Sequence, residues 1–224
     1  MKSECNDGSL FVITGTTSSG KDTIVNEVFG KQFRSSDVGK IVSYTSREKR
    51  KGEVDGRDYY FISESTFDGL RNLIVPDTVD GKKYGTCAES IGLVLGGLDM
   101  VWGINISGAS RVEGEIRKAF NEEETDRIIG NMVIIVIGTD SLFTLRDRFI
   151  RRASESGIER GMASKSFLNR IRGDWKAWND WQFRDSQVHV VINNEIGAAV
   201  EKVRRIVEIH RAARRQVVED CLVM

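Results

Sequence analysis

Residues 15–23 read GTTSSGKDT, one letter away from the phosphate-binding pattern G-x-x-x-x-G-K-[ST]. The apolar run LFVI (residues 10–13) precedes this loop, and the helix-forming segment DTIVNEVF (residues 22–29) follows it. A loop in this position presents backbone N–H groups to phosphate oxygens, and the positive end of the helix dipole faces the same anion. The stretch therefore predicts a nucleotide site in which Lys21 neutralises the β and γ phosphates. The predicted phosphate-binding residues are Gly15, Thr16, Thr17, Ser18, Ser19, Gly20, Lys21, Asp22 and Thr23.

Asp22 stands where the usual pattern has the hydroxyl that holds a magnesium ion. A carboxylate in the first turn of a helix is favourable by itself, so a helix-start residue that faces away from the ligand is one interpretation. Mg²⁺ prefers hard oxygen ligands, however, and a carboxylate so close to a polyphosphate would otherwise be repulsive. We therefore predict Asp22 as a Mg²⁺ ligand and Thr23 as a second candidate for the same ion.

Lysine plus arginine and aspartate plus glutamate each number 33 among the 224 residues, so the formal net charge is zero. A neutral chain has no overall field that favours nucleic acid or an anionic membrane, and any anion site must be built locally. The apolar runs are too short for a signal peptide or a membrane span. Three widely separated cysteines (Cys5, Cys87 and Cys221) indicate reduced thiols. We expect a cytoplasmic monomer or homodimer that binds neither nucleic acid nor a membrane.

Short apolar runs alternate with helical segments along most of the chain. The runs lie at residues 10–13, 101–106, 132–137 and 188–192, and helices are predicted at about 21–29, 65–73, 109–120, 141–152, 165–182 and 195–215. Buried strands that alternate with helices predict a layered α/β fold with a largely parallel sheet. Residues 41–93 read as a small β-rich insertion and residues 146–182 as an arginine-rich addition, which leaves a core of about 1–40, 94–145 and 183–224.

The stretch VSYTSREKRKGEVDGRDYYFIS (residues 42–63) has the composition of a phosphate-monoester site. It contains Arg47 and Arg50, then a turn at residues 55–56, then Tyr59 and Tyr60. Guanidinium groups pair bidentately with phosphate, and a tyrosine hydroxyl donates one more hydrogen bond without adding charge. A solvated basic loop is the alternative interpretation, and these residues alone do not decide between the two.

The segment R-x-x-R-x-G-E-x-D-G-x-D-Y (residues 47–59), with the phosphate loop before it and YGT (residues 84–86) after it, resembles the guanylate kinase family of nucleoside monophosphate kinases. This resemblance implies the three-layer sandwich of P-loop nucleoside triphosphatases, ATP as phosphoryl donor and Mg²⁺ as cofactor. It places the acceptor nucleotide on Ser43, Arg47, Arg50, Tyr59, Tyr84, Thr86 and Asn105. It makes residues 146–182 a lid, with Asn193 near the adenine of ATP, and implies the catalytic residues Lys21, Arg47, Arg148, Arg152 and Arg170.

The chain departs from the family pattern in three features. Val75 stands where the family has a glutamate that reads guanine, and Gly103 and Asn105 stand in place of an Asp-x-Asp. Asp77 or Asp80 could supply the missing base-reading carboxylate if the loop is re-routed. The third departure is the carboxylate gained at position 22, which could compensate for the one lost at position 103.

We predict ATP- and Mg²⁺-dependent phosphoryl transfer to a nucleoside monophosphate, with GMP or dGMP as the favoured acceptor. The G-K-D loop and INISGASR (residues 104–111) are also similar to ribose 1,5-bisphosphate phosphokinase, so a sugar-phosphate kinase is one alternative. A catalytically silent binding module, like the guanylate-kinase-like domains of scaffold proteins, is the other. We expect structural roles for His189 and His210, and core packing for Trp175, Trp178 and Trp181.

Overall fold

The computed structural model describes residues 7–181 and 187–223. Its central sheet has five parallel strands in the order β2-β7-β1-β8-β9. These strands are Gly39–Ile41 (β2), Met100–Gly103 (β7), Leu10–Gly15 (β1), Met132–Gly138 (β8) and Gln187–Ile192 (β9). The strands β1 and β8 are almost wholly buried, because both faces of a parallel sheet are covered by helices. The predicted α/β fold with a parallel sheet is confirmed.

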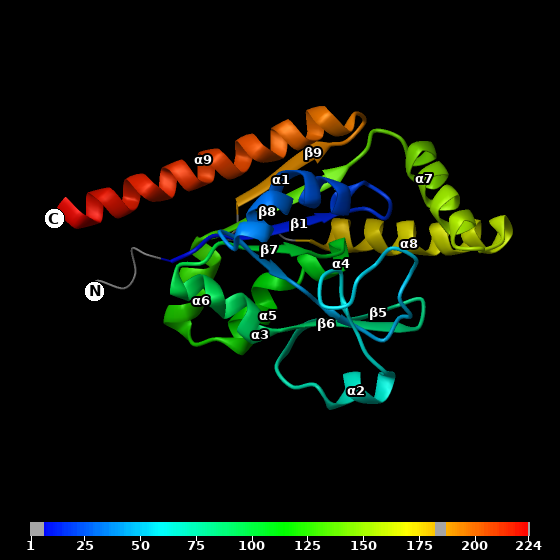
Figure 1. Ribbon diagram of the computed structural model, residues 1–224, viewed down its shortest axis with the longest axis horizontal. Helices are drawn as coiled ribbons and strands as arrows, with labels where there is room; N and C mark the ends of the chain where they lie inside the picture. The colour runs from blue at the N-terminus through cyan, green and yellow to red at the C-terminus, as the bar shows by residue number, and fades with distance from the viewer. Residues whose placement is uncertain (1–6, 182–186, 224) are drawn as a thin grey trace.

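Helices cover both faces of this sheet (Figure 1). Leu10 and Val12 of β1 pack into the core on one face, while Phe11 and Ile13 pack into the core on the other. The second of these faces is covered by the long helices Lys21–Ser35 (α1) and Ile196–Val223 (α9). The first is covered by Ala88–Gly92 (α3), the 3-10 helix Leu93–Gly96 (η2), Ile106–Ala109 (α4), Val112–Ala119 (α5) and Glu122–Gly130 (α6). The result is the three-layer sandwich that the resemblance implied.

Several predicted boundaries are wrong, and capping side chains explain most of the differences. The predicted strand 101–106 ends at Gly103, because Asn105 caps α4 by accepting a hydrogen bond from the Gly108 backbone at 2.6 Å. The predicted helix 109–120 is α5, which begins only at Val112 because α4 occupies residues up to Ala109. The helix α6 was not predicted, although Asn121 and Glu124 form a capping box at its start. The predicted helix 65–73 is only Glu64–Gly69 (α2).

A second sheet, in the order β4-β3-β6-β5, forms most of the predicted insertion. Its strands are Tyr60–Phe61 (β4), Tyr44–Thr45 (β3), Lys82–Cys87 (β6) and Leu73–Val79 (β5). The pairing of β5 with β6 shifts register between Ile74 and Asp77, and Val75 within this bulge has a φ of 52°. Pro76 has no N–H group to give to the ladder, which favours a bulge at this place. The bulge makes Asp77 the partner of Tyr84.

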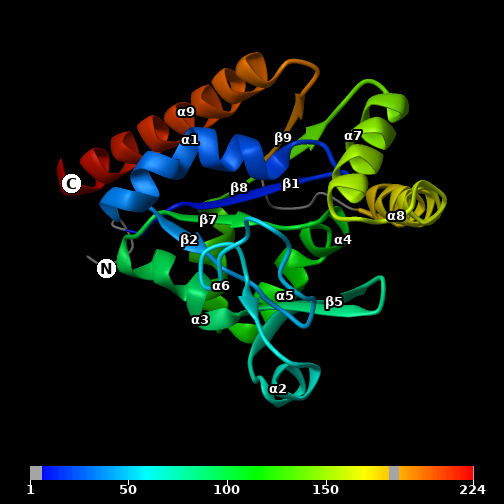
Figure 2. The ribbon, with the colours of Figure 1, turned by 45° about the vertical axis from the view of Figure 1, so that its right-hand side comes forward.

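Leu142–Glu155 (α7) and Arg160–Asp180 (α8) form a helix pair to one side of the central sheet, above the β5–β6 hairpin (Figure 2). They pack on each other through a small cluster of their own, which includes Phe149 and Phe167. The predicted core role of Trp175 is wrong, because this side chain is 67% exposed. Only the end of α8 reaches the main core, where Trp178 and Trp181 pack against it.

The remaining expectations concern residues outside the site. His189 lies on β9, and His210 on α9 is buried against the ring of Phe11, with ring centroids 5.7 Å apart. Cys87 is a free thiol, whereas Cys5 and the side chain of Cys221 lie outside the described residues. Within the described ranges, no helix combines the length and the apolarity that crossing a bilayer requires.

Candidate active site

A cleft of about 1510 Å³ opens between the phosphate loop, the second sheet and the α7–α8 pair. It lies at the carboxyl ends of β1 and β7, where parallel α/β sheets bind their ligands. Every residue predicted for the site lines this cleft: Gly15, Thr16, Thr17, Ser18, Ser19, Gly20, Lys21, Asp22, Thr23, Ser43, Arg47, Arg50, Tyr59, Tyr84, Thr86, Asn105, Arg148, Arg152, Arg170 and Asn193. The cleft therefore gathers side chains from segments that are far apart in the sequence.

The phosphate loop joins the end of β1 to the start of α1. Gly20 has a φ of 91°, and a Cβ at this position would lie 2.4 Å from the Asn193 amide nitrogen, so only glycine fits. The buried hydroxyls of Thr16, Ser18 and Ser19 bond to none of the described residues. Buried polar groups in proteins almost always have partners. These hydroxyls therefore fit the oxygens of a bound phosphate chain.

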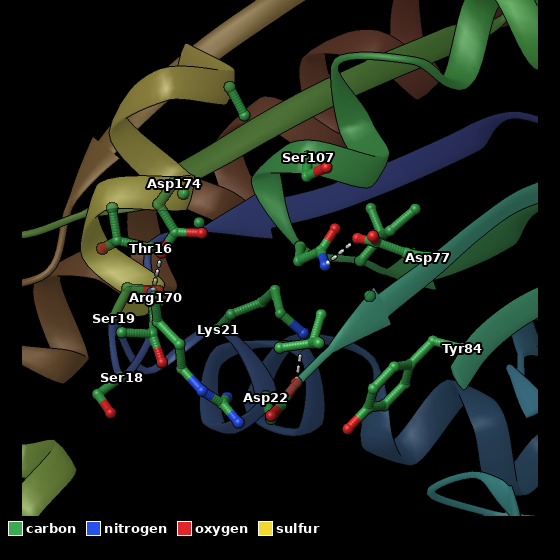
Figure 3. Close-up of a pocket in the computed structure, with 18 of the residues that line it drawn as sticks. Thr16, Ser18, Ser19, Lys21, Asp22, Asp77, Tyr84, Ser107, Arg170 and Asp174 are labelled. Atoms are coloured by element: carbon green, nitrogen blue, oxygen red, sulfur yellow. Dashed lines mark hydrogen bonds and ion pairs between the residues drawn. The ribbon is translucent and has the colours of Figure 1, made fainter. Parts of the chain in front are cut away.

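Lys21 and Asp22 form an ion pair, with 2.5 Å between the Lys21 Nζ and the Asp22 Oδ1 (Figure 3). Burial is the largest single influence on the pKa of Lys21 and lowers it, but the charge and hydrogen bond of Asp22, together with Tyr59, outweigh burial, and the pKa is raised. The attraction of Lys21 in turn lowers the pKa of Asp22, whose side chain is 82% exposed. A Cβ at Gly103 would lie 3.1 Å from the Lys21 Nζ and 4.0 Å from the Asp22 Oδ1. A carboxylate at position 103 would thus reach the region that Asp22 occupies.

The wall formed by the second sheet carries the predicted acceptor residues. The hydroxyls of Ser43 and Thr86 lie 2.7 Å apart, and the rings of Tyr59 and Tyr84 meet edge to face. Burial raises the pKa of Tyr59, so its hydroxyl stays protonated and can donate a hydrogen bond. Tyr60 points elsewhere, since its ring stacks on Tyr44 and it does not line the cleft.

Arg47 is held in place by Glu53, a residue for which no role was predicted from the sequence. The guanidinium donates to both carboxylate oxygens of Glu53, at 3.0 and 2.8 Å. It also lies 5.5 Å from the ring centroid of Tyr59 and 5.4 Å from that of Phe61. Burial works against the charge of Arg47, but the hydrogen bonds and charge of Glu53, together with Tyr84, outweigh burial and raise the pKa of the guanidinium. Glu53 therefore fixes the direction in which Arg47 presents its remaining N–H groups.

Arg50, Arg152 and Arg170 bring positive charge together at the mouth of the cleft. Burial and then the neighbouring Arg47 lower the pKa of Arg50. Burial, followed by Arg50 and Arg170, lowers the pKa of Arg152. The Arg50 side chain makes neither a hydrogen bond nor an ion pair with any residue that the structure describes. Arg170 pairs with Asp80, whereas Arg50 and Arg152 form no ion pair with a described residue. Crowded cations of this kind form a site for a polyanion.

Asn193 lies on the other side of the phosphate loop and is buried. Its side-chain amide nitrogen donates to the Ser19 backbone carbonyl oxygen at 2.7 Å, and its backbone carbonyl oxygen accepts from the Arg148 guanidinium at 3.4 Å. Asn193 therefore ties the loop to the end of β9. That Asn193 lies beside the adenine of ATP remains a prediction.

Comparison with known proteins identifies the family. The family model for guanylate kinase matches residues 7–113. A guanylate kinase of Deinococcus radiodurans is 31% identical over 214 residues, which cover 93% of this chain and 78% of that protein. The chain belongs to the guanylate kinase family. A guanylate kinase of Rhizobium meliloti is 29% identical over 211 residues, which cover 92% of this chain and 85% of that protein.

The solved structures agree with this assignment at the level of the fold. The crystal structure of guanylate kinase from Anaplasma phagocytophilum matches with a TM-score of 0.58 and 22% sequence identity, and covers 93% of this chain and 87% of that one. The guanylate kinase family consists of nucleoside monophosphate kinases, and this chain is one of them. These relatives support neither the sugar-phosphate kinase nor the silent binding module.

In this guanylate kinase family member, α8 also contacts the second sheet, through the Asp80 carboxylate. Arg170 donates to Asp80 at 2.9 Å from Nε and at 2.6 Å from Nη2, and Ser166 donates to the same carboxylate at 3.1 Å. Asp80 lies in the turn between β5 and β6, so these bonds join α8 to the acceptor wall. No local sequence pattern pairs residues 90 positions apart, so this contact was not predicted.

Asp174 of α8 reaches the phosphate loop, where it accepts a hydrogen bond from the Thr17 backbone at 2.9 Å. Burial raises the pKa of Asp174 to about 6, although the Thr17 bond works in the opposite direction. A carboxylate in this position competes with phosphate for the same backbone donors. The sequence gives no signal for it, because Asp174 resembles any polar residue of an exposed helix.

Replacing Asp174 with asparagine is expected to stabilise the ligand-free protein more at pH 7 than at pH 5. The folded chain holds the Asp174 proton more tightly than the unfolded chain, so the carboxylate destabilises the fold increasingly as the pH rises from about 4 to about 6. The full effect is at most about 3 kcal/mol. Urea unfolding at both pH values measures the gain. Asp147→Asn on α7 is the control, and an equal gain from Asp174→Asn at both pH values would contradict the assignment.

Proposed function

We propose that the chain transfers the γ-phosphoryl group of ATP to GMP or dGMP, which gives ADP and the nucleoside diphosphate. One observation carries the proposal: the phosphate loop and the wall of arginines and tyrosines line the same cleft. Its volume of about 1510 Å³ exceeds the ~300–1,000 Å³ of a pocket for one small molecule, so donor and acceptor fit together. The relatives above are named guanylate kinases, which supports GMP as the acceptor.

Phosphoryl transfer needs in-line positioning and neutralised charge rather than a nucleophilic side chain. In this proposal the loop and Lys21 hold the donor phosphates. The acceptor phosphate is held by Arg47, Arg50, Tyr59 and Tyr84. Ser43 and Thr86 lie further along the wall, and Asn105 lines the cleft from the start of α4. Residues 41–93 form the acceptor-binding part and residues 146–182 the lid, whose residues Arg148, Arg152 and Arg170 balance charge on the transferred group and help to exclude water.

The residues around Asp22 fit a magnesium ion. The carboxylate is exposed toward the cleft, its pKa is lowered by Lys21, and the Thr23 hydroxyl follows it in the chain, so hard oxygen donors are available. Mg²⁺, when bound, neutralises charge on the phosphates of ATP. Asp22 would hold the ion from the start of α1, in the region that a side chain at Gly103 would otherwise reach.

Replacing Asp22 with serine makes one charged metal ligand neutral. We expect an increase of about tenfold in the Mg²⁺ concentration at which the affinity for ATP reaches half of its maximum. Calorimetric titration of ATP over a range of Mg²⁺ concentrations measures this shift without relying on turnover. Glu27→Gln on the same helix, outside the cleft, is the matched control. A variant that is more active than the parent and has the same magnesium dependence would remove Asp22 from the metal site.

The function itself is tested by ADP release with ATP and Mg²⁺ against a panel of acceptors. The panel contains GMP, dGMP, the other nucleoside monophosphates and ribose 1,5-bisphosphate. Turnover with GMP or dGMP is the expected outcome. Turnover with only the sugar phosphate, or ATP binding without turnover of any acceptor, would overturn the proposal.

A further inference from the structure

The bulge in β5 decides which side chain of this strand faces the cleft. Val75 is 5% exposed and packs into the hydrophobic core, so it offers nothing to a ligand. The register shift instead places Asp77 opposite Tyr84, and the Asp77 side chain lines the cleft (Figure 3). Asp80, the other carboxylate of this hairpin that lines the cleft, is bound to Arg170 and Ser166 of α8.

Asp77 is fixed in position before any ligand arrives. The Asn105 amide donates to its Oδ2 at 3.0 Å, and the Thr78 backbone donates to its Oδ1 at 2.9 Å. Arg111 donates from both terminal nitrogens to the Pro76 carbonyl oxygen at 3.2 Å, which fastens the bulge to α5. The Arg111 Nη2 lies 3.9 Å from the Asp77 Oδ2, too far for a hydrogen bond. The carboxylate therefore keeps lone pairs available on both oxygens.

The charge of Asp77 indicates which part of the acceptor it meets. A carboxylate repels phosphate, and the crowded arginines already provide for phosphate at another part of the cleft. Asp77 therefore suits a group that presents hydrogen-bond donors and no negative charge. The edge of guanine presents two adjacent donors, N1–H and the 2-amino group, which match the two oxygens of a carboxylate.

We propose that Asp77 is the specificity-determining residue of the acceptor site, and that it accepts hydrogen bonds from the N1–H and 2-amino groups of a 2-amino-6-oxopurine. This inference rests on the proposed function and deepens it. Asn105 and Arg111 are positioning residues, since Asn105 orients the carboxylate and Arg111 holds the bulge that presents it.

The test compares GMP with IMP, which lacks only the 2-amino group, in the wild-type protein and in Asp77→Asn. The asparagine oxygen can accept a hydrogen bond from one of the two guanine donors, but the asparagine NH₂ group then faces the other guanine donor and cannot bond to it. We expect kcat/KM for GMP to fall by about 100-fold and the GMP:IMP preference to fall to within about threefold of one. Asp68→Asn is the matched control: it makes the same charge change in the same sheet region, and Asp68 pairs with Lys83 outside the cleft.

An unchanged GMP:IMP preference in folded Asp77→Asn would overturn the inference while wild-type turnover of GMP kept the proposed function intact. Absence of GMP turnover in the wild-type protein would instead reject the proposed function. Arg111→Lys is a second variant, because lysine keeps the charge but loses the double contact with Pro76. It is expected to reduce the GMP:IMP preference by about threefold and leave the KM for ATP unchanged, whereas an unaltered preference would remove Arg111 from its positioning role.

Discussion

Replacing Lys21 with alanine is expected to lower kcat by about 10³-fold while the protein stays folded. The Lys21 ammonium lies at the base of the cleft, directly after the phosphate loop, and its side chain is only 17% exposed. The transition state spreads negative charge over the transferred phosphoryl group and the leaving phosphate, and a fixed cation stabilises this charge more than mobile water does. Asp22 loses its partner in the variant, but its exposed carboxylate remains hydrated, so stability changes by no more than about 1 kcal/mol.

Rapid-quench measurement of one turnover with saturating ATP and GMP separates this effect from weaker binding. Lys31→Ala is the matched control, because Lys31 belongs to the same helix and points into solvent. A kcat within tenfold of the wild-type value in Lys21→Ala would mean that the loop binds nucleotide without stabilising the reaction.

Replacing Arg50 with glutamine is expected to lower kcat/KM for GMP by about 10²- to 10³-fold with little change in the KM for ATP. The Arg50 guanidinium has no counter-charge of its own among the described residues, so its N–H groups are available to the acceptor phosphate. The neutral amide of glutamine offers neither the charge nor the planar fork that suits phosphate.

The same variant is expected to make the ligand-free protein slightly more stable. Burial and Arg47 lower the pKa of Arg50, which means that its charge is unfavourable in the empty cleft. In Arg50→Gln, the midpoint of thermal unfolding should therefore rise while kcat/KM for GMP falls. Arg57→Gln is the control, since Arg57 lies in the same loop and pairs with Asp58 away from the cleft. A parallel loss of stability and activity in Arg50→Gln would indicate a structural role.

The parts of the site that were predicted from the sequence all depend on short, local patterns. The phosphate loop is one turn between one strand and one helix, and the arginines and tyrosines of residues 47–59 lie within a single segment. Local spacing can predict such groups, because the atoms that cooperate are neighbours along the chain. The α/β class with a largely parallel sheet followed from the same reasoning, since buried apolar runs alternate with helices only in a few arrangements. The order of the strands in the sheet was not predicted.

The contacts that were missed join residues separated by long stretches of chain. Asp174 meets Thr17, and Arg170 meets Asp80, only after α8 has packed beside the second sheet. The proline in β5 was a visible signal for a bulge, but its consequence depends on the register with β6, which no local pattern specifies. For the same reason the sequence left Asp77 and Asp80 as equal candidates.

The unpartnered hydroxyls of the phosphate loop and the crowded guanidinium groups of Arg50 and Arg152 also affect the folding equilibrium. Both features make the empty protein less stable than its packing alone would, because buried dipoles lack partners and like charges lie close together. A bound polyphosphate supplies oxygen acceptors to the hydroxyls and negative charge to the guanidinium groups. By linkage, ligand at a hundredfold excess over its Kd adds about 2.7 kcal/mol to the free energy of unfolding. The nucleotide concentration thus affects the fraction of chains that are folded, in addition to the rate of turnover.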